Sequence, residues 1–392
     1  MLVATSLVML MTPGLAFFYG GLVGRKNVLA IMIQSFVSMG WTTVLWFCFG
    51  YSLCFSGNYF GIIGDFQQIF LRGLNPADLH ANGFPLLIFV AYQMMFAIIT
   101  PALITGAFAN RMHFKSYLVF LTIWLIFVYF PVCHMTWGPG GLFQQWGVLD
   151  FAGGTVVHTT AGFAALASVL FIGKRKTAEE TPHNIPFVAL GAALLWFGWY
   201  GFNAGSELAA DKITALAFFN TDIAASFAAV TWLLLVWIFE KKPKFVGLLT
   251  GAVAGLVAIT PAAGFVSLWA APIIGIIAAV VCYLAVVLKN RLKFDDALDV
   301  WGVHGVGGVV GCICVGLFAA VSANPAGANG LFYGNPILLI KQTAVVLGVA
   351  FYAFIFSYAM LWLINKFQAA RISETEELNG LDFALHGEAA YE

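Results

Sequence analysis

The sequence predicts an all-α polytopic membrane protein with eleven transmembrane helices, and three observations support this fold class. Of 392 residues, 61% are hydrophobic and only 9% are charged, whereas about a quarter of a soluble domain is charged. Apolar stretches of about 20 residues, the length that crosses a bilayer, recur along the chain. The connectors between them alternate in basic charge. The formal net charge of zero gives no reason to expect a nucleic-acid partner.

Each predicted span is an apolar segment bounded by polar or charged residues. The eighth span is short, and the eleventh is long enough to tilt or to project from the bilayer. The spans cover residues 2–20, 28–53, 84–109, 116–136, 151–172, 185–203, 214–239, 245–260, 266–288, 299–321 and 336–366.

Basic residues gather in every second connector, so that fifteen of the 18 fall on one side of the predicted bundle. These are Arg25, Lys26, Arg111, Lys115, Lys174, Arg175, Lys176, Lys241, Lys242, Lys244, Lys289, Arg291, Lys293, Lys366 and Arg371; the other side has Arg72, Lys212 and Lys341. Because basic connectors stay in the cytoplasm, we expect a protein of the cytoplasmic membrane with its N-terminus outside and its C-terminus inside.

Spans five and ten share a pattern of aspartate, seven residues, histidine, and glycine four residues later. Span five reads "DFAGGTVVHTTAG" from Asp150 through His158, and span ten reads "DALDVWGVHGVGG" from Asp296 through His304. The two copies lie five spans apart along the chain, so they run in opposite directions, as in an inverted repeat. Eight residues of helix rise about 12 Å, which places both histidines near the middle of the membrane.

The repeat defines the predicted organisation of the chain. A transmembrane domain of residues 1–366 contains inverted repeats of about 1–172 and 185–321, with helix eleven added, and residues 367–392 form a cytoplasmic tail. The tail is polar and acidic. It is interpreted either as a loosely ordered extension or as a contact for neighbouring subunits or regulation.

A matched pair of intramembrane histidines indicates function, because burying ionisable groups in hydrocarbon is costly. The pair would ligate a metal or haem, or line a narrow path for a small hydrogen-bonding solute. No third ligand occurs in a matching context, and the six cysteines lack metal-ligand spacing. We therefore expect no cofactor, no metal and no enzymatic activity. The alternative is two unrelated core histidines. The other five histidines fall in loops or at helix ends and are interpreted as surface residues.

Motifs along nearly the whole chain resemble the ammonium transporter (Amt/Mep/Rh) family, and the bacterial Amt branch closely. They read "TPGLAFFYGGLVGRKN", "HMTWGPGG", "DFAGGTVVH", "GWYGFNAGS", "TALAFFNT", "DVWGVHGVGG" and "GLDFALHGEAAY". The resemblance implies ammonium or ammonia transport by an eleven-helix homotrimer with one pore per subunit. It also implies an inner face on which a trimeric PII-type regulator can dock.

The resemblance assigns pore and gate residues. His158 and His304 match the family's twin-histidine pair. Phe96, in "YQMMFAIIT", and Phe218, in "TALAFFNT", match the two stacked gate phenylalanines. A phenylalanine gate favours passage of neutral NH3, since desolvating an ion costs many kcal/mol.

The resemblance also assigns residues of an outer recruitment site. Trp137 in "HMTWG" matches the lid of this site, Tyr92 stands where many relatives have Phe, and Asp150 matches the carboxylate that holds the vestibule loop. Aromatic faces attract cations by roughly 0.5–2 kcal/mol each. Trp137, Tyr92 and Phe96 would therefore concentrate ammonium at the mouth.

Asp222 departs from the family pattern. It lies one turn after Phe218, at the distance from the gate where relatives have a serine that binds ammonium. Residues four apart share a helix face, so Asp222 is expected in the same vestibule, where a carboxylate would hold ammonium tightly and oppose its release. This favours, as the alternative function, an ammonium sensor with little or no transport, either by itself or fused to a cytoplasmic signalling domain. Two other interpretations are that Asp222 is protonated, or that it is paired with Lys212 or with a backbone group.

Overall fold

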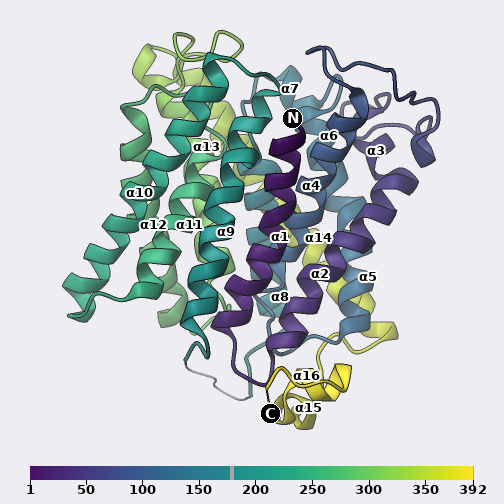
Figure 1. Cartoon of the computed structure of the whole chain (residues 1–392), viewed down its shortest axis with the longest axis vertical. Helices are drawn as coiled ribbons and strands as arrows, with labels where there is room; N and C mark the ends of the chain where they lie inside the picture. The colour runs from purple at the N-terminus through teal and green to yellow at the C-terminus, as the bar shows by residue number, and fades with distance from the viewer. Residues whose placement is uncertain (177–180, 392) are drawn as a thin grey trace.

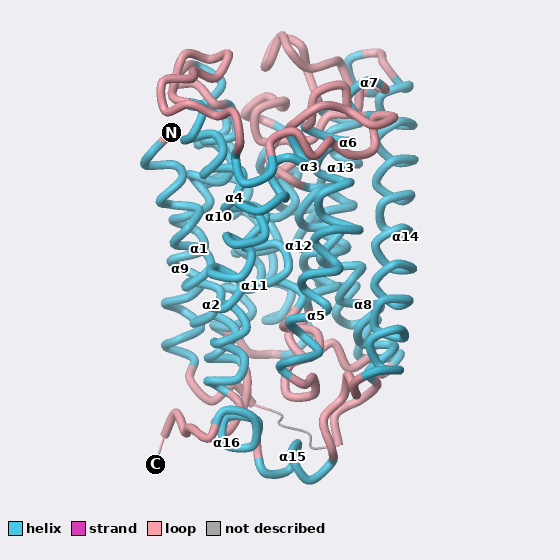
Figure 2. The backbone as a smooth tube through the Cα atoms, turned by 90° about the vertical axis from the view of Figure 1, so that its right-hand side faces the viewer, coloured by secondary structure: helices cyan, strands magenta, loops and turns pink. Residues whose placement is uncertain are grey.

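The computed structural model describes residues 1–176 and 181–391 as a bundle of long helices that run roughly side by side (Figure 1). The N-terminus lies at one end of the bundle, called here the upper end, and the C-terminus lies at the opposite, lower end (Figure 1). In the described residues, pairing between extended segments is limited to isolated β-bridges. Figure 2 shows that long loops cover the upper end.

Ten helical segments among the described residues are long and apolar enough to cross a membrane. They are α1 (Leu2–Leu22), α2–η1–α3 (Val28–Leu45, Trp46–Gly50 and Tyr51–Phe55), α4 (Leu86–Ile104), α5–η3–α6–α7 (Phe114–Trp124, Leu125–Tyr129, Phe130–Trp137 and Leu142–Gln145), η4–α8 (Gly154–Thr159 and Thr160–Ile172), α9–η5 (Ile185–Ala204 and Gly205–Glu207), α10 (Lys212–Glu240), α12 (Ala270–Leu292), η6–α13 (Trp301–Gly305 and Val306–Phe318) and α14 (Pro336–Phe367).

The remaining helices are shorter. They are η2 (Ile69–Leu71), α11 (Phe245–Ile259), η7 (Leu331–Tyr333), α15 (Glu374–Asn379) and α16 (Leu381–His386). Each predicted span coincides with a helix, but α11, the predicted eighth span, has only 15 residues. The structure thus supports a multi-pass helical membrane protein with ten candidate spans, and the predicted span at 245–260 stays a prediction.

Glycines let the helices cross at very short distance. A Cβ at Gly191 of α9 would lie 2.2 Å from the backbone nitrogen of Phe18 in α1, and one at Gly162 of α8 would lie 2.1 Å from the backbone of Gly305 in η6. Such contacts maximise van der Waals packing, which drives helix association where lipid removes the hydrophobic driving force. The second crossing places the two histidine-bearing segments against each other.

The described part of the tail is not loosely ordered, which corrects one of the two interpretations of the sequence. Helices α15 and α16 pack at the lower end of the bundle (Figure 2). Asp382 accepts a hydrogen bond from the backbone nitrogen of Ala30 in the first turn of α2 at 2.8 Å, where the helix dipole favours a carboxylate. Arg371 pairs with buried Glu377 at 2.7 Å. Residue 392 lies outside the described residues.

Candidate functional site

Three cavities succeed one another between the two ends of the bundle, and the upper one is walled by aromatic rings. This upper cavity has a volume of about 240 Å³. Its lining residues carry no Lys or Arg side chain; they are Phe55, His80, Phe89, Gln93, Phe96, Thr136, Trp137, Gln144, Phe151, Ser206 and Leu208. Cation-attracting ring faces without a competing cation suit a small cationic ligand.

Trp137 is fixed by the loop that begins the histidine-bearing helix. Its indole Nε1 donates to the backbone oxygen of Asp150 at 2.9 Å. The Asp150 carboxylate in turn accepts the backbone N–H groups of four successive residues, 153–156, at 2.7–3.2 Å. These are the orphan donors of the first turn of η4. Asp150 therefore ties together the wall of the upper cavity and the segment that carries His158.

Phe202 of α9, and not Phe218, packs its ring on that of Phe96, so the prediction of Phe218 is wrong. The centroids of Phe96 and Phe202 lie 4.3 Å apart. Phe218 of α10 instead stacks on Tyr200 at 4.2 Å, and 47% of its surface is exposed. Phe202 and Phe218 each lie in a family-like motif, and only the rotation of α9 and α10 decides which of them points inward.

Asp222 follows Phe218 to the outside of the site, which corrects its expected place in the vestibule. Its Oδ1 accepts a hydrogen bond from the Tyr200 hydroxyl at 2.6 Å, and it does not line the upper cavity. Ser206 takes the expected place, because it lies four residues after Phe202 and lines the cavity. The described chain thus has a hydroxyl, rather than a carboxylate, at the expected distance from the inward-facing phenylalanine.

Tyr92 was expected on the wall of the upper cavity, but it lies behind that wall. It is fully buried, and its hydroxyl contacts the backbone oxygen of Gly201 at 2.8 Å and the Ser206 hydroxyl at 3.2 Å. Its ring meets Phe96 edge-on at 5.1 Å. Tyr92 therefore positions Phe96 and Ser206 and does not line the upper cavity.

Below the phenylalanine pair lies a narrow, mostly apolar passage of about 10 Å³ that contains both histidines. A cavity of this size holds about one water molecule. His158 and His304 are nearly fully buried, their rings lie 5.4 Å apart at 21°, and their Nδ1 atoms are 3.3 Å apart. The Trp199 ring stacks on His158, with the ring centroids 5.4 Å apart.

The contact between the two Nδ1 atoms fixes the chemistry of the neutral pair. One Nδ1 donates and the other accepts, so one Nε2 keeps a lone pair while the other Nε2 carries a proton. The Nε2 of His158 is buried and has no hydrogen-bond partner among the described residues. The pair can therefore offer one acceptor and one donor to a small neutral solute.

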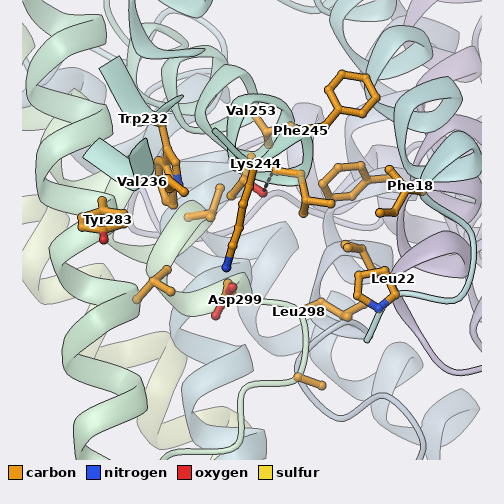
Figure 3. A pocket seen from close by; sticks show the side chains of 18 of the residues that line it. Phe18, Leu22, Trp232, Val236, Lys244, Phe245, Val253, Tyr283, Leu298 and Asp299 are labelled. Atoms are coloured by element: carbon orange, nitrogen blue, oxygen red, sulfur yellow. Dashed lines mark hydrogen bonds between the residues drawn. The ribbon is translucent and has the colours of Figure 1, made fainter. Parts of the chain in front are cut away.

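The lower cavity is wide and charged. It has a volume of about 810 Å³ and begins at His304, which lines both this cavity and the narrow passage. Figure 3 shows Lys244 and Asp299 reaching into it. Lys244 also pairs with Glu240, and Asp299 pairs with Lys289 at 2.6 Å.

An ionic cluster holds the loop that precedes the second histidine-bearing helix. Asp295 contacts Arg111 at 3.3 Å and Arg175 at 2.6 Å, and Arg111 is fully buried. Burial opposes ionisation of Asp295, but hydrogen bonds from Arg175 and the charge of Arg111 outweigh it and lower the pKa of Asp295 to about 2. The neighbouring Asp296 accepts the backbone N–H of Trp301 in η6 at 2.7 Å.

Metal-ligating side chains do not converge in the described part of the chain. No group of three or more His, Cys, Asp or Glu residues there is arranged to hold a metal ion.

The family model described as "Ammonium Transporter Family" matches residues 1–391. The chain belongs to the ammonium transporter family. It is 47% identical to an ammonium transporter of Bacillus subtilis over 98% of this chain and 96% of that protein. The solved structure of Candida albicans Mep2 matches at a TM-score of 0.89 and 38% identity, over 99% of this chain and 89% of that one. A structure described as "Sensor Amt Protein" matches at a TM-score of 0.89 and 30% identity, over 98% and 96%.

The chain belongs to a family of transporters, and the relatives named above are not enzymes. This agrees with the prediction from the sequence that the protein is not an enzyme. Phe202 and Ser206 were missed as site residues, although both lie in the motif "GWYGFNAGS". A signal was available, because a phenylalanine four residues before a serine is the spacing expected of the gate and the ammonium-binding hydroxyl. Phe218 offers no serine at that distance.

Proposed function

We propose that this chain conducts ammonia from the upper cavity, past Phe96 and Phe202, along His158 and His304, to the lower cavity. The observation that carries the proposal is the unpartnered Nε2 of His158 in the narrow passage. A buried polar atom without a partner costs free energy unless a ligand or water satisfies it. Membership of the ammonium transporter family supports ammonia as that ligand.

Recruitment begins in the upper cavity. Ammonium meets the faces of Trp137 and Phe96 and the hydroxyl of Ser206, all of which line the cavity. Cation–π attraction favours ammonium over neutral solutes, and a cavity without fixed charge releases it readily. This balance of capture and release suits transport.

Passage then requires ammonium to give up a proton to water in the upper cavity, so that neutral NH3 enters the passage. The rings of Phe96 and Phe202, whose centroids lie 4.3 Å apart, line the upper cavity and the narrow passage respectively. A passage of about 10 Å³ cannot hold the hydration shell of an ion. Neutral NH3 can accept a hydrogen bond from one Nε2 and donate one to the other. The histidine pair thereby replaces part of its hydration without adding charge.

Several finer features of the proposal rest on the sequence and the family resemblance. They are the upper end facing outside and the lower end facing the cytoplasm, a cytoplasmic-membrane location, an inverted repeat, a homotrimer with one pore per subunit, the division into residues 1–366 and 367–392, and a PII-type regulator at the lower end. The likeness of the two histidine-bearing segments supports the repeat.

An ammonium sensor on the same fold is the second candidate. The similarity to the structure described as "Sensor Amt Protein" favours it. Asp222 does not, because its carboxylate binds Tyr200 outside the cavity.

Uptake of labelled methylammonium into proteoliposomes tests the proposal. We expect the parent to show uptake and His158→Ala to lower it at least about tenfold, since the narrow passage then loses one of the two ring nitrogens that can hydrogen-bond the solute. Asp222→Ser and Phe218→Ala are matched controls, because both residues face away from the pathway. Unchanged uptake by His158→Ala contradicts the proposed route. Binding of ammonium without uptake by the parent favours the sensor.

A further inference from the structure

His80 is the one side chain on the wall of the upper cavity that can change its charge near neutral pH. The other lining residues of this cavity are aromatic, aliphatic, amide or hydroxyl side chains. His80 lies in the loop before α4, a position for which the sequence predicts a surface residue. It shares the cavity with Trp137, Phe96 and Ser206.

The imidazole of His80 is held in a defined position. It stacks on Phe84 at 4.8 Å and 22° and on Phe89 at 4.8 Å and 28°. Its Nδ1 accepts the backbone N–H of Asn82 at 3.2 Å, and its backbone nitrogen donates to the oxygen of Phe84 at 2.8 Å. The neutral ring therefore carries its proton on Nε2.

Protonation of this ring changes both its charge and its hydrogen bonding. A second proton on Nδ1 removes the acceptor of the Asn82 N–H and puts a full positive charge on the cavity wall. Burial lowers the pKa of His80 below its usual value, so the ring is neutral at pH 7 and gains its charge only at lower pH.

Charged groups around His80 are few. The elements that line the cavity beside it contribute uncharged Phe55, Phe89, Gln93, Thr136 and Gln144. Asp78, on the same loop, accepts the backbone N–H of Asn75 at 2.7 Å. The amide of Asn82 donates to the backbone oxygen of Leu208 at 3.2 Å, which brings the loop near Glu207 and, farther along the chain, Asp211 and Lys212.

We propose that His80 is a proton-operated switch of the upper cavity, whose charged form excludes ammonium from the aromatic site. The inference rests on the proposed function, because it assumes that ammonium enters this cavity. Two cations in a cavity of about 240 Å³ repel each other across a few ångströms, in surroundings less polar than water. The apparent affinity for ammonium falls on the order of tenfold as the ring becomes charged.

The ammonium dependence of uptake at about pH 7.5 and about pH 5 tests the switch, a range in which ammonium itself stays protonated while histidine titrates. For the parent we expect KM to rise on the order of tenfold at the lower pH. His80→Gln abolishes this rise, and His80→Lys raises KM already at the higher pH. His386→Gln, at the lower end, keeps the parent's pH dependence and serves as the matched control.

Two results overturn the inference. One is a KM that rises equally in the parent and in His80→Gln. The other is a rise that Glu207→Gln, and not His80→Gln, abolishes. Ammonium binding to purified protein, followed by calorimetry at both pH values, separates this inference from the proposed function. Binding that weakens in acid only when His80 is present supports the switch even if the protein shows no uptake. Absence of binding at both pH values overturns it.

Discussion

The two segments that carry the histidines are alike in backbone and different in the way their first turns are held. Each begins with a π-helical turn, η4 or η6, and each follows an aspartate. Asp150 accepts four backbone N–H groups. Asp296 accepts that of Trp301 at 2.7 Å, and Lys289 donates to its backbone oxygen at 3.0 Å. The upper segment is thus held by backbone donors, whereas the lower one also depends on charged side chains.

This difference separates the proposed recruiting end from an anchoring end. Holding Asp150 with backbone donors leaves the upper cavity without a cationic side chain, which would compete with ammonium in the proposed route. The lower end carries the cluster of Arg111, Arg175 and Asp295. Paired charges are tolerated there because they line a wide cavity or join loops, outside the narrow passage.

Substitution of glycine where the two histidine-bearing segments cross should have the largest effect on folding, and the two sides of this crossing differ. A Cβ at Gly162 would lie 2.1 Å from the backbone of Gly305, whereas a Cβ at Gly305 would lie 3.0 Å from the Trp301 side chain and 3.2 Å from the backbone of Gly162. We expect Gly162→Ala to cost about 5 kcal/mol and to prevent folding, and Gly305→Ala to cost about 1 kcal/mol. The yield of folded protein after detergent extraction measures both, and equal yields would contradict the asymmetry.

Removal of the Asp150 or the Asp296 carboxylate should have the next largest effect on stability, and the two costs should differ. Asp150→Ala leaves four backbone donors without their acceptor and should lower the free energy of unfolding by about 4 kcal/mol, against about 2 kcal/mol for Asp296→Ala. Thermal unfolding in detergent measures both. Asp150→Asn, which keeps one side-chain oxygen, should fall between the parent and Asp150→Ala. If Asp296→Ala is the more damaging change, the lower cap is the main anchor.

The ionic cluster predicts a dependence on pH that belongs to the lower end. Because the pKa of Asp295 is lowered to about 2, against about 3.9 when unfolded, its contribution is present above about pH 4 and is lost as the pH falls toward about 2. Asp295→Asn leaves buried Arg111 without that carboxylate and should cost on the order of 3 kcal/mol at neutral pH. The gap between the melting temperatures of parent and variant should close in acid. A gap that stays constant would show that the cluster does not depend on ionisation.

Removal of one aromatic face at the upper end should give the smallest effect. Trp137→Ala removes a cation–π contact and should raise KM for ammonium on the order of tenfold, equivalent to about 1.4 kcal/mol. Trp137→Phe keeps a ring face and should raise it less. Trp232→Phe, on the lining of the lower cavity, is the matched control and should leave KM unchanged. A shift of KM by the control would show that the lower cavity also sets ammonium affinity.

The sequence predicted those features of the site that depend on local spacing. The shared pattern of Asp150 with His158 and of Asp296 with His304 predicted that the two histidines lie together, and their Nδ1 atoms are 3.3 Å apart. Trp137 lines the upper cavity, and its role as the lid of a recruitment site stays a prediction from the family resemblance. The expected positions of Phe218 and Asp222 were both wrong for one reason. The two residues lie one turn apart on α10, and the face of α10 that carries them points away from the upper cavity.

By itself, the sequence determined the all-helical membrane class, the approximate bounds of the helices and the aspartate–histidine pattern shared by spans five and ten. Hydropathy, charge alternation and residue spacing are properties of the chain before it folds. Only the tertiary structure decided that Phe202 packs on Phe96, that Ser206 lines the cavity, and that His80 joins its wall. Each of these depends on how neighbouring helices and loops rotate and cross. Contacts between segments far apart in the sequence set that rotation, and such contacts leave no trace in the local sequence pattern.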